Sequence, residues 1–306
     1  MKITIVIPSY NQGQFIGRTI DSILNQGYAN LELLVMDGGS SDDTLQILKS
    51  YGDRIAWQSA PDRGQTQAVN NGWKITTGQI LGWVNSDDLL LPGALEKVAG
   101  YFETHPETNW LYGNCCYIDA ADQTLGDYPV KHYDYDRLIK DLQNYVPQPA
   151  VFLRRSILDS IGFLNEDLHY VMDLDYWLRI GLKFPAIHLD SPLACLRLHQ
   201  DAKSVSSYKR FSTELVSTVE ALFARTDLPD SVRRLRLYSL ARAHLLAADM
   251  NFWAGDSKSA APFAWQSWKM RPYRLHKLYL YILLGKFGQK LARQQHSNPY
   301  ELGLLK

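Results

Sequence analysis

The sequence passes from a buried strand to clustered carboxylates within nine residues, ILGWVNSDD at Ile80–Asp88. The apolar run that opens this stretch can only be buried, and Asn85, Ser86, Asp87 and Asp88 follow it at once. A strand that ends in carboxylates places them at the rim of a sheet, where a divalent cation could hold a phosphorylated ligand. Oxygen ligands suit a hard metal such as Mg²⁺ or Mn²⁺. The same residues also suit a turn or a helix cap, so the stretch alone leaves both interpretations open.

Upstream of this stretch, strand-like and helix-like patterns alternate, which predicts an α/β domain with a mostly parallel sheet and flanking helices. In open sheets of this kind, ligands bind beyond the carboxyl ends of the strands. Polar, acidic or glycine-rich residues follow each of the first four strands, so we expect four loops to converge on one rim. The expected strands are Ile3–Ile7, Leu31–Met36, Ile55–Ala60 and Ile80–Val84, with helices between them over 15–27, 45–48 and Gln65–Thr76.

The same domain continues to about residue 205. The pattern predicts a helix from Pro92 to about His105, a strand-rich stretch over Trp110–Val130, and a helix that begins near Met172. Residues 145–153 read as a strand that its prolines place at an edge or a bend. Two further strands, Ala186–Leu189 and Leu193–His199, are expected to close the domain.

From Tyr208 onward the strand signal ends, which predicts an all-helical region over 206–306. Residues 241–272 resemble one tetratricopeptide hairpin, with an ordinary helical hairpin as the alternative. Six Lys/Arg and no acidic residue surround the apolar letters YLYILL between Arg271 and Arg293. This segment could lie on an anionic membrane surface, or it could pack on its neighbours with a solvated basic face.

Composition excludes several classes of protein. The chain has 306 residues, 46% of them hydrophobic, and 32 Lys/Arg balance 32 Asp/Glu, so nothing in its charge indicates a nucleic-acid partner. Of three cysteines, Cys115 and Cys116 are adjacent and Cys195 is alone, so we expect no disulfide framework and a reducing compartment. The N-terminal apolar stretch is too short for a signal peptide, and no apolar run approaches the roughly 18 residues that cross a bilayer. We expect a cytoplasmic protein, or one peripheral on the cytoplasmic face of a membrane.

The strand-end loops offer groups for each part of a nucleotide ligand. The ring of Tyr10 could stack on a base, and Asp37 could accept a hydrogen bond from a base or ribose. Arg63 could pair with a diphosphate, and Gly64 would let the backbone come close. Each has a structural alternative, which is packing for Tyr10, a tight turn for Asp37 and a surface turn for Arg63. Carboxylates after the fourth strand would need a cation beside a diphosphate, since like charges repel.

Together these motifs resemble the inverting nucleotide-sugar glycosyltransferase family 2, which has the GT-A fold. The resemblance is carried, in chain order, by IVIPSYNQGQFIGRTIDSILNQ, LVMDGGSSDDT, PDRGQTQAVNNGWKITTGQILGWVNSDD and HYVMDLDYWLRIG. It covers about residues 1–205 and implies a Rossmann-like, mostly parallel sheet with flanking helices. The helical region over 206–306 lies outside it.

The resemblance implies roles for residues near the donor. Pro8, Tyr10 and Asp37 would hold the nucleoside, and Asp62 and Arg63 would lie near the ribose or diphosphate. The implied ligand is a nucleotide-sugar, with a UDP-sugar as the first expectation.

A divalent metal, Mn²⁺ or Mg²⁺, is also implied. Asp87 and Asp88 match the family's metal-binding acidic motif. Asp often stands where this chain has Asn85, and an amide supplies no charge, so we expect Asn85 to contact the sugar or a metal-bound water. His199, in LRLHQDAKS, matches a histidine that completes the metal or diphosphate site in some relatives, with a structural role at a strand end as the alternative.

Asp173 matches the family's catalytic base, which removes a proton from the acceptor hydroxyl. Glu commonly precedes this base, whereas Met172 does so here. Asp175 lies about 200° further around a helix of 3.6 residues per turn, so it cannot aim at the same atom. We expect Asp175, together with Gln148 and Trp177, on the acceptor side or in support of the helix.

The expected activity is a metal-dependent inverting transfer of a sugar from a nucleotide-diphosphate-sugar to a hydroxyl of a carbohydrate or lipid-linked acceptor. Surface polysaccharide, lipopolysaccharide or glycolipid synthesis is the implied setting. One alternative is a sugar-nucleotide nucleotidyltransferase, which usually carries an N-terminal glycine-rich loop with a basic residue that PSYNQGQF lacks. Another is a non-catalytic nucleotide-sugar-binding or scaffold protein, against which Asp87, Asp88 and Asp173 argue.

Overall fold

The computed structural model describes residues 1–306 apart from 143, 200–207, 273–276, 286–287 and 289–306. The chain forms two compact units, one of residues 1–133 and 145–197 and the other of 134–144 and 198–306. The second unit thus begins close to the expected boundary at 205. It also takes in residues 134–144, which the sequence pattern assigned to the first domain.

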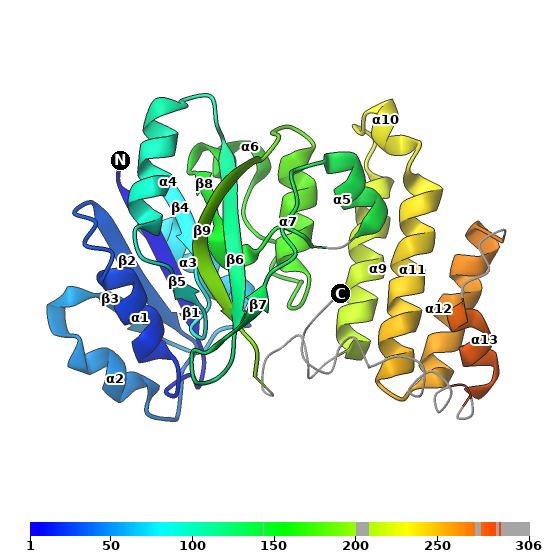
Figure 1. The fold of residues 1–306 in the computed structure, drawn as a ribbon, viewed down its shortest axis with the longest axis horizontal. Coiled ribbons are helices and arrows are strands. Elements are labelled where there is room, and N and C mark those ends of the chain that lie inside the picture. The colour runs from blue at the N-terminus through cyan, green and yellow to red at the C-terminus, as the bar shows by residue number, and fades with distance from the viewer. Residues whose placement is uncertain (143, 200–207, 273–276, 286–287, 289–306) are drawn as a thin grey trace. The chain divides into compact units, whose positions relative to one another are not determined.

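Four parallel strands form one half of the sheet of the first unit (Figure 1). Their spatial order is β3-β2-β1-β4, and they are β1 (Ile3–Ser9), β2 (Leu31–Asp37), β3 (Ala56–Ser59) and β4 (Ile80–Trp83). Ser9 pairs with Asp37, and Asp37 pairs with Ser59, so the carboxyl ends of three strands meet at one edge. The predicted strands and their shared rim are confirmed.

The other half of the sheet is mixed. Beyond β4 lie β8 (Val151–Arg154), β6 (Trp110–Ile118), β9 (Ile187–Arg197) and β5 (Leu89–Leu90), and β7 (Thr124–Asp127) pairs with β6. Strand β8 is interior, because the prolines of the predicted 145–153 strand fall before it, around the 3₁₀-helix η2 (Gln148–Ala150). The two strands expected near 186–199 are one, β9, whose register with β6 shifts beside Gly113 and Asn114.

Helices flank this sheet as predicted, and each buries one face. Helix α1 buries Ile16, Ile20 and Ile23 at the spacing of an amphipathic helix. The others are α2 (Thr44–Ser50), η1 (Gly52–Arg54), α3 (Gln65–Ile75), α4 (Ala94–Thr104), α6 (Ser156–Ile161) and α7 (Met172–Gly181), with α1 spanning Ile16–Leu24.

Four tryptophans stack through the core of the first unit. Trp177 lies between Trp83 and Trp110, with ring centroids 5.6 and 5.2 Å away, and Trp73 meets Trp83 edge-on at 5.5 Å. All four side chains are fully buried. Since such rings bury large apolar areas and gain further from their mutual packing, they fix α3 and α7 against the sheet.

The structure pairs two of the three cysteines, contrary to the sequence expectation. Cys116 and Cys195 are register partners on β6 and β9, their Cα atoms are 4.5 Å apart, and they form a disulfide. Cys115 is a buried free thiol. The adjacency of the first two cysteines misled the expectation, because the partner comes from another strand 79 residues away.

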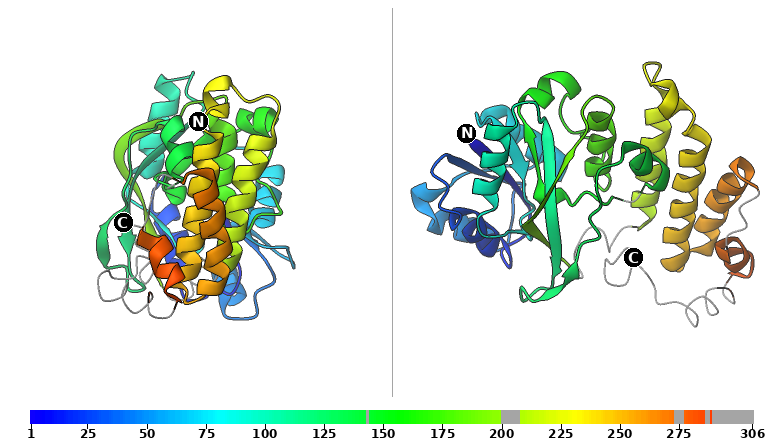
Figure 2. Two further views of the ribbon diagram at one scale, coloured as in Figure 1. Left: turned by 90° about the vertical axis from the view of Figure 1, so that its right-hand side faces the viewer. Right: turned by 45° about the horizontal axis from the view of Figure 1, so that its top comes forward.

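The second unit is helical, as predicted. Its helices are α5 (Tyr135–Asp141), α9 (Tyr208–Ala224), α10 (Asp230–Arg233), α11 (Arg236–Trp253), α12 (Ser257–Met270) and α13 (Lys277–Leu283). Helix α11 lies between α9 and α12 (Figure 2), and small residues such as Ala243 and Ala247 let the neighbouring helices approach it. The hairpin expected at 241–272 is the pair α11 and α12.

The basic segment 271–293 is described only in part. It contains α13, while much of the rest lies outside the described residues. Among the residues that are described, no helix is both long and apolar enough to cross a membrane.

Gly72 provides a test of how closely α3 packs on the sheet. A Cβ atom there would lie 2.7 Å from Cγ1 of Val6, so we expect Gly72→Ala to destabilise the fold by about 1–3 kcal/mol through overpacking. Gly100, on the exposed side of α4, has no atom within 4 Å of such a Cβ. Gly100→Ala should leave stability unchanged or raise it by up to about 1 kcal/mol. Urea unfolding of both variants measures the difference, and equal midpoints would contradict this account of the packing.

Candidate functional site

The loops after β1 and β2 are joined at the rim. The backbone N–H of Asn11 donates to Oγ of Ser40 at 2.7 Å, and the N–H of Ser41 donates to Oδ1 of Asn11 at 2.9 Å. Asn11 has a φ of 52°, a left-handed conformation that Asn tolerates better than most residues. This turn leaves the side chain of Tyr10 62% exposed beside the end of β2. The ring is therefore available for stacking, while Pro8 lies buried within β1.

Asp37 holds the end of β2 and the loop after it in place through hydrogen bonds. Its carboxylate is buried and accepts hydrogen bonds from the N–H groups of Gly39 and Ser40 at 3.0 and 2.9 Å. It also accepts from the hydroxyls of Ser40 and Ser59 at 2.5 and 2.6 Å. The turn interpretation of Asp37 thus describes this structure, and a ligand that binds the carboxylate would have to exchange with one of these donors.

Two glycines let the third loop close against its neighbours. A Cβ on Gly38 would lie 3.1 Å from both carboxylate oxygens of Asp62, and Asp62 accepts from the N–H of Gly64 at 2.8 Å. Gly64 has a φ of 119°, and a Cβ there would lie 3.1 Å from Nδ1 of His169. His169 thus reaches the predicted diphosphate loop from the segment before α7. Sequence reasoning did not single it out, although it stands in the HYVMDLDYW motif.

Arg63 is turned toward a carboxylate of the protein. Its guanidinium forms an ion pair with Glu166, and its side chain is 66% exposed. Glu166 also accepts from Asn70 at 3.1 Å and from Gln67 at 3.2 Å. These hydrogen bonds, that of Asn70 first, lower the pKa of Glu166. A diphosphate would have to compete with Glu166 for Arg63.

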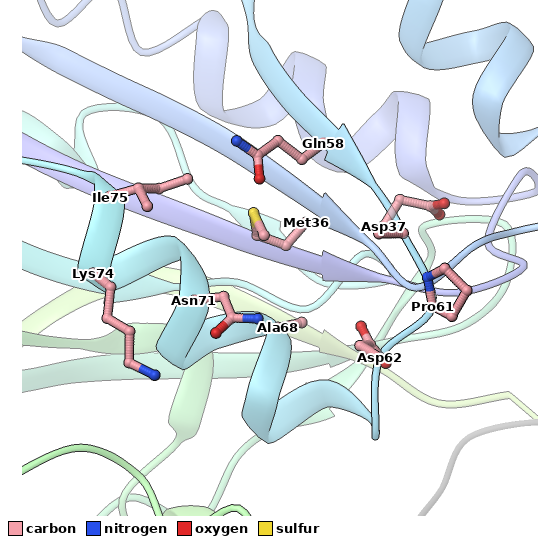
Figure 3. A pocket seen from close by; sticks show the side chains of 10 residues that line it. Met36, Asp37, Gln58, Pro61, Asp62, Ala68, Asn71, Lys74 and Ile75 are labelled. Carbon is pink, nitrogen blue, oxygen red and sulfur yellow. The ribbon is translucent and has the colours of Figure 1, made fainter.

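A cavity of about 270 Å³ adjoins the rim between β2, β3 and α3. Figure 3 shows Asp37 and Asp62 at one end and Lys74 and Ile75 at the other, with Met36 and Gln58 between them. It therefore offers carboxylates and a cation along a partly apolar trough.

The acidic turn after β4 is held in place by its own side chains. Asn85 accepts from Nε2 of Gln65 at 2.5 Å and donates to Oδ2 of Asp88 at 3.0 Å. Asp88 is 2% exposed, and its Oδ1 accepts from the backbone N–H of Arg197 at 2.9 Å. Burial and the neighbouring charge of Asp87 raise the pKa of Asp88, against these hydrogen bonds. Both oxygens of Asp88 are thus used inside the protein.

Arg197, at the end of β9, fastens this turn. Its side chain is fully buried, with Nε donating to the carbonyl of Asp87 at 2.7 Å and Nη1 donating to the carbonyl of Asp119 at 2.6 Å. It also forms an ion pair with Asp122, and its guanidinium carbon lies 5.0 Å from the ring centre of Phe15. Sequence reasoning did not single out Arg197. In the letters LRLH it is only one residue of a predicted strand with alternating side chains.

The fit of a metal ion can be tested on this donor set. Within the described ranges, no group of three or more His, Cys, Asp and Glu side chains could hold a metal. Since Asp88 is buried and hydrogen-bonded, the half-buried carboxylate of Asp87 is the donor that the turn offers at the rim. His199 follows β9 in the chain but belongs to the second unit, so it is left out of this site. Oxygen chemistry fits Mn²⁺ or Mg²⁺, with further ligands from the donor and water.

Asp173 shares an electrostatic environment with Asp88. Burial, then Tyr117, then the charge of Asp173 raise the pKa of Tyr128. Burial and the charge of Asp88 raise the pKa of the Cys115 thiol in the same way. The rings of Tyr117 and Tyr128 are 5.3 Å apart. The charges of Asp173 and of Asp88 thus each act on one member of this group of tyrosine and cysteine side chains.

The remaining candidates divide between the site and the core. Gln148 is 8% exposed, donates to the carbonyl of Trp83 at 2.7 Å, and has no partner for its Oε1 among the described residues. Asp175 pairs with Arg179 at 2.8 Å, which places it in the support of α7. Trp177, expected on the acceptor side, is wholly buried in the tryptophan stack and cannot contact an acceptor.

The sequence and the fold match known proteins. The model of glycosyl transferase family 2 matches residues 4–162, more than half of the chain. An uncharacterized glycosyltransferase of Rickettsia prowazekii is 30% identical over 197 residues, covering 61% of each chain. A PGL/p-HBAD biosynthesis glycosyltransferase of Mycobacterium bovis is 29% identical over 181 residues, 58% of this chain and 68% of its own. The chain spans between 36% and 66% of the length of four rickettsial relatives.

Solved structures share the fold at low identity. S. aureus TarS 1–349 in complex with UDP-GlcNAc superposes with a TM-score of 0.70 at 17% identity, over 96% of this chain and 92% of its own. A mannosyltransferase of Pyrobaculum calidifontis in complex with GDP-Man and Mn²⁺ gives 0.62 at 17% identity, over 98% and 81%. The fold is therefore the GT-A fold of glycosyltransferases, followed by a helical region. The chain belongs to glycosyl transferase family 2.

The buried guanidinium of Arg197 should carry a measurable part of the stability. Arg197→Gln removes its ion pair and leaves backbone carbonyls without donors, so we expect a loss of about 2–4 kcal/mol. Arg18 pairs with the same Asp122 at 3.0 Å, but its side chain is 36% exposed. Arg18→Gln should therefore cost less than about 1 kcal/mol. Chemical unfolding compares the two, and a similar small loss in both would show that Arg197 does not fasten the turn.

Proposed function

We propose that this protein is an inverting, metal-dependent glycosyltransferase that moves a sugar from a nucleotide-diphosphate-sugar to a hydroxyl acceptor. One observation carries the proposal. The loops that bear Tyr10, Asp37 and Asp62 share one rim with the acidic turn, because β3, β2, β1 and β4 are parallel neighbours in that order. Such a rim supports donor binding there, and we propose Asp173, at the start of α7, as the base.

Donor binding would use the first three loops. The exposed ring of Tyr10 would stack on the base, and Asp37 would hold the loop or exchange a hydrogen bond with the nucleoside. Asp62 and Arg63, beside Gly64 and His169, would face the ribose and diphosphate. A UDP-sugar is the proposed donor, supported by the UDP-GlcNAc complex of TarS, although the mannosyltransferase carried GDP-Man.

In the transfer step, Asp173 would accept the proton of the acceptor hydroxyl as its oxygen forms a bond to the anomeric carbon. The bond from that carbon to the diphosphate oxygen breaks at the same time, and the nucleoside diphosphate leaves with the electron pair. Attack from the opposite face inverts the anomeric centre. A bound divalent metal would neutralise charge on the leaving diphosphate. Asp87 would be its ligand from the turn, with further ligands from the donor and water.

The acceptor side would lie near Gln148. Its unpartnered Oε1 is a hydrogen-bond acceptor next to the end of β4, where a sugar hydroxyl would satisfy it. Asn85, held between Gln65 and Asp88, would present its amide to the donor sugar or to water. We propose a carbohydrate or lipid-linked acceptor in surface polysaccharide or glycolipid synthesis. The mycobacterial relative is named for PGL/p-HBAD biosynthesis.

Removing the base separates binding from chemistry. Asp173→Asn should bind the donor normally and lose at least about a hundredfold in transfer rate, because general-base catalysis contributes on this scale. Asp175→Asn is the matched control two residues along the same helix, since Asp175 pairs with Arg179. It should lower stability slightly and keep transfer. Measuring released nucleoside diphosphate decides, and near-normal turnover in Asp173→Asn would remove the base assignment.

A thermal-shift panel tests the donor and the metal. UDP-, GDP- and dTDP-sugars are added with and without Mn²⁺, and a ligand at a hundred times its Kd should stabilise the folded state by about 2.7 kcal/mol. We expect the largest shift with a UDP-sugar and Mn²⁺ together. Asp87→Asn should abolish the part that depends on Mn²⁺, while the exposed Asp53→Asn should keep it.

Failure would take distinct forms. A Mn²⁺-dependent shift that survives in Asp87→Asn would exclude the metal site. A shift by donors without transfer to any acceptor would favour the non-catalytic binding protein.

A further inference from the structure

Helix α12 displays two stacked tryptophans to solvent. Trp265 and Trp268 are 57% and 36% exposed, and their ring centroids are 5.0 Å apart at an angle of 18°. The spacing of three residues puts both rings on one face of the helix. Large aromatic side chains rarely remain in water as a pair, because a contiguous exposed apolar patch usually marks a contact surface.

The opposite face of α12 is already occupied, so the orientation of the helix is fixed. Ala260 and Ala264 are buried, and Ser267 donates to the carbonyl of Ala241 at 2.7 Å. The tryptophans therefore cannot turn inward without breaking the hairpin of α11 and α12.

The next helix, α13, also leaves apolar side chains exposed. On α13, Leu278 and Ile282 pack on the hairpin, whereas Leu280 is 57% exposed and Leu284, just beyond the helix, is 41% exposed. Lys277 is exposed at the spacing that shares a face with these two leucines. We call the exposed residues Trp265, Trp268, Leu280 and Leu284, with the lysines around them, the outer face.

The charge of the outer face has one sign. Lys258 and Lys269 are exposed on α12. In the sequence from Ser257 to Tyr300 there are eight Lys/Arg and no Asp or Glu. In a chain with balanced charge overall, all the charged side chains of this stretch of sequence are thus basic.

We propose that the outer face docks on an anionic lipid surface, with the tryptophans and leucines at the headgroup boundary and the lysines paired with lipid phosphates. Tryptophan suits this boundary because its ring is apolar and its indole N–H is polar. Exposed cations are attracted to the negative surface potential of an anionic membrane. The proposed membrane contact then centres on α12, which precedes the basic segment 271–293 that the sequence analysis considered for this role.

Other occupants fit the observations less well. A second copy of the chain would bring its own Lys258, Lys269 and Lys277 against those of the first across a symmetric interface, and like charges would repel. A soluble polyanion would use the lysines but would leave Leu280 and Leu284 in water. An anionic lipid surface would both pair with the lysines and cover the exposed apolar side chains.

Vesicle sedimentation of the full chain tests the proposal. Wild type should bind vesicles of phosphatidylcholine with about 30% phosphatidylglycerol, and should bind more weakly to pure phosphatidylcholine or in high salt. Trp265→Ala/Trp268→Ala should lose more than about tenfold in affinity. Lys258→Gln/Lys269→Gln should lose severalfold. Arg233→Gln/Leu237→Ala, which removes one exposed cation and one exposed apolar side chain elsewhere in the same unit, should bind as wild type.

Three outcomes would overturn the proposal. They are unchanged binding by the double tryptophan variant when its melting temperature shows it is folded, equal binding to neutral and anionic vesicles, and light scattering that shows a wild-type dimer lost in that variant. Donor-induced thermal shifts should be the same in all variants, so this test stands apart from the proposed activity.

Discussion

A buried arginine holds the site in shape. Arg197 donates through its backbone to Asp88 and through its side chain to the carbonyl of Asp87, so the end of β9 and the turn after β4 cannot move independently. A guanidinium with no exposure is costly unless its donors are used. The carbonyl of Asp119 and the carboxylate of Asp122 both lie at Nη1, while the buried Nη2 has no hydrogen-bond partner among the described residues. The acidic turn is therefore preorganised by the distant half of a mixed sheet.

The two adjacent carboxylates of the acidic turn, Asp87 and Asp88, have different roles in this arrangement. Asp88 is buried and accepts hydrogen bonds that fix the turn, whereas its half-buried neighbour Asp87 is the metal ligand that we propose. Asn85 follows the same logic, because its amide can donate to Asp88 and accept from Gln65 at once, as a carboxylate could not. The departure from the commoner acidic residue thus has a structural reason in this chain.

The sequence predicted those helices and strands that a local pattern of apolar and polar residues determines. Buried strands and amphipathic helices have short periods, so β1 to β4, their flanking helices and the shared rim could be placed within a few residues. The local pattern could not predict contacts between residues that are far apart in the chain. Arg197 is defined by groups about 78 residues away in the chain, and the Cys116–Cys195 bridge by a register between two strands. Of the two roles expected for Trp177, its burial in the tryptophan stack agrees with support of the helix.

The short segment 134–144 has a consequence for how the chain must be divided. Leu138 and Ile139 on α5 are fully buried in the second unit, where Ser239 donates to the carbonyl of Ile139 across 100 residues. During synthesis α5 emerges long before α11, so the apolar face of α5 stays uncovered until α11 has been made. A fragment ending at residue 205 would keep this face uncovered, so it would be prone to aggregate even though every strand of the sheet is present.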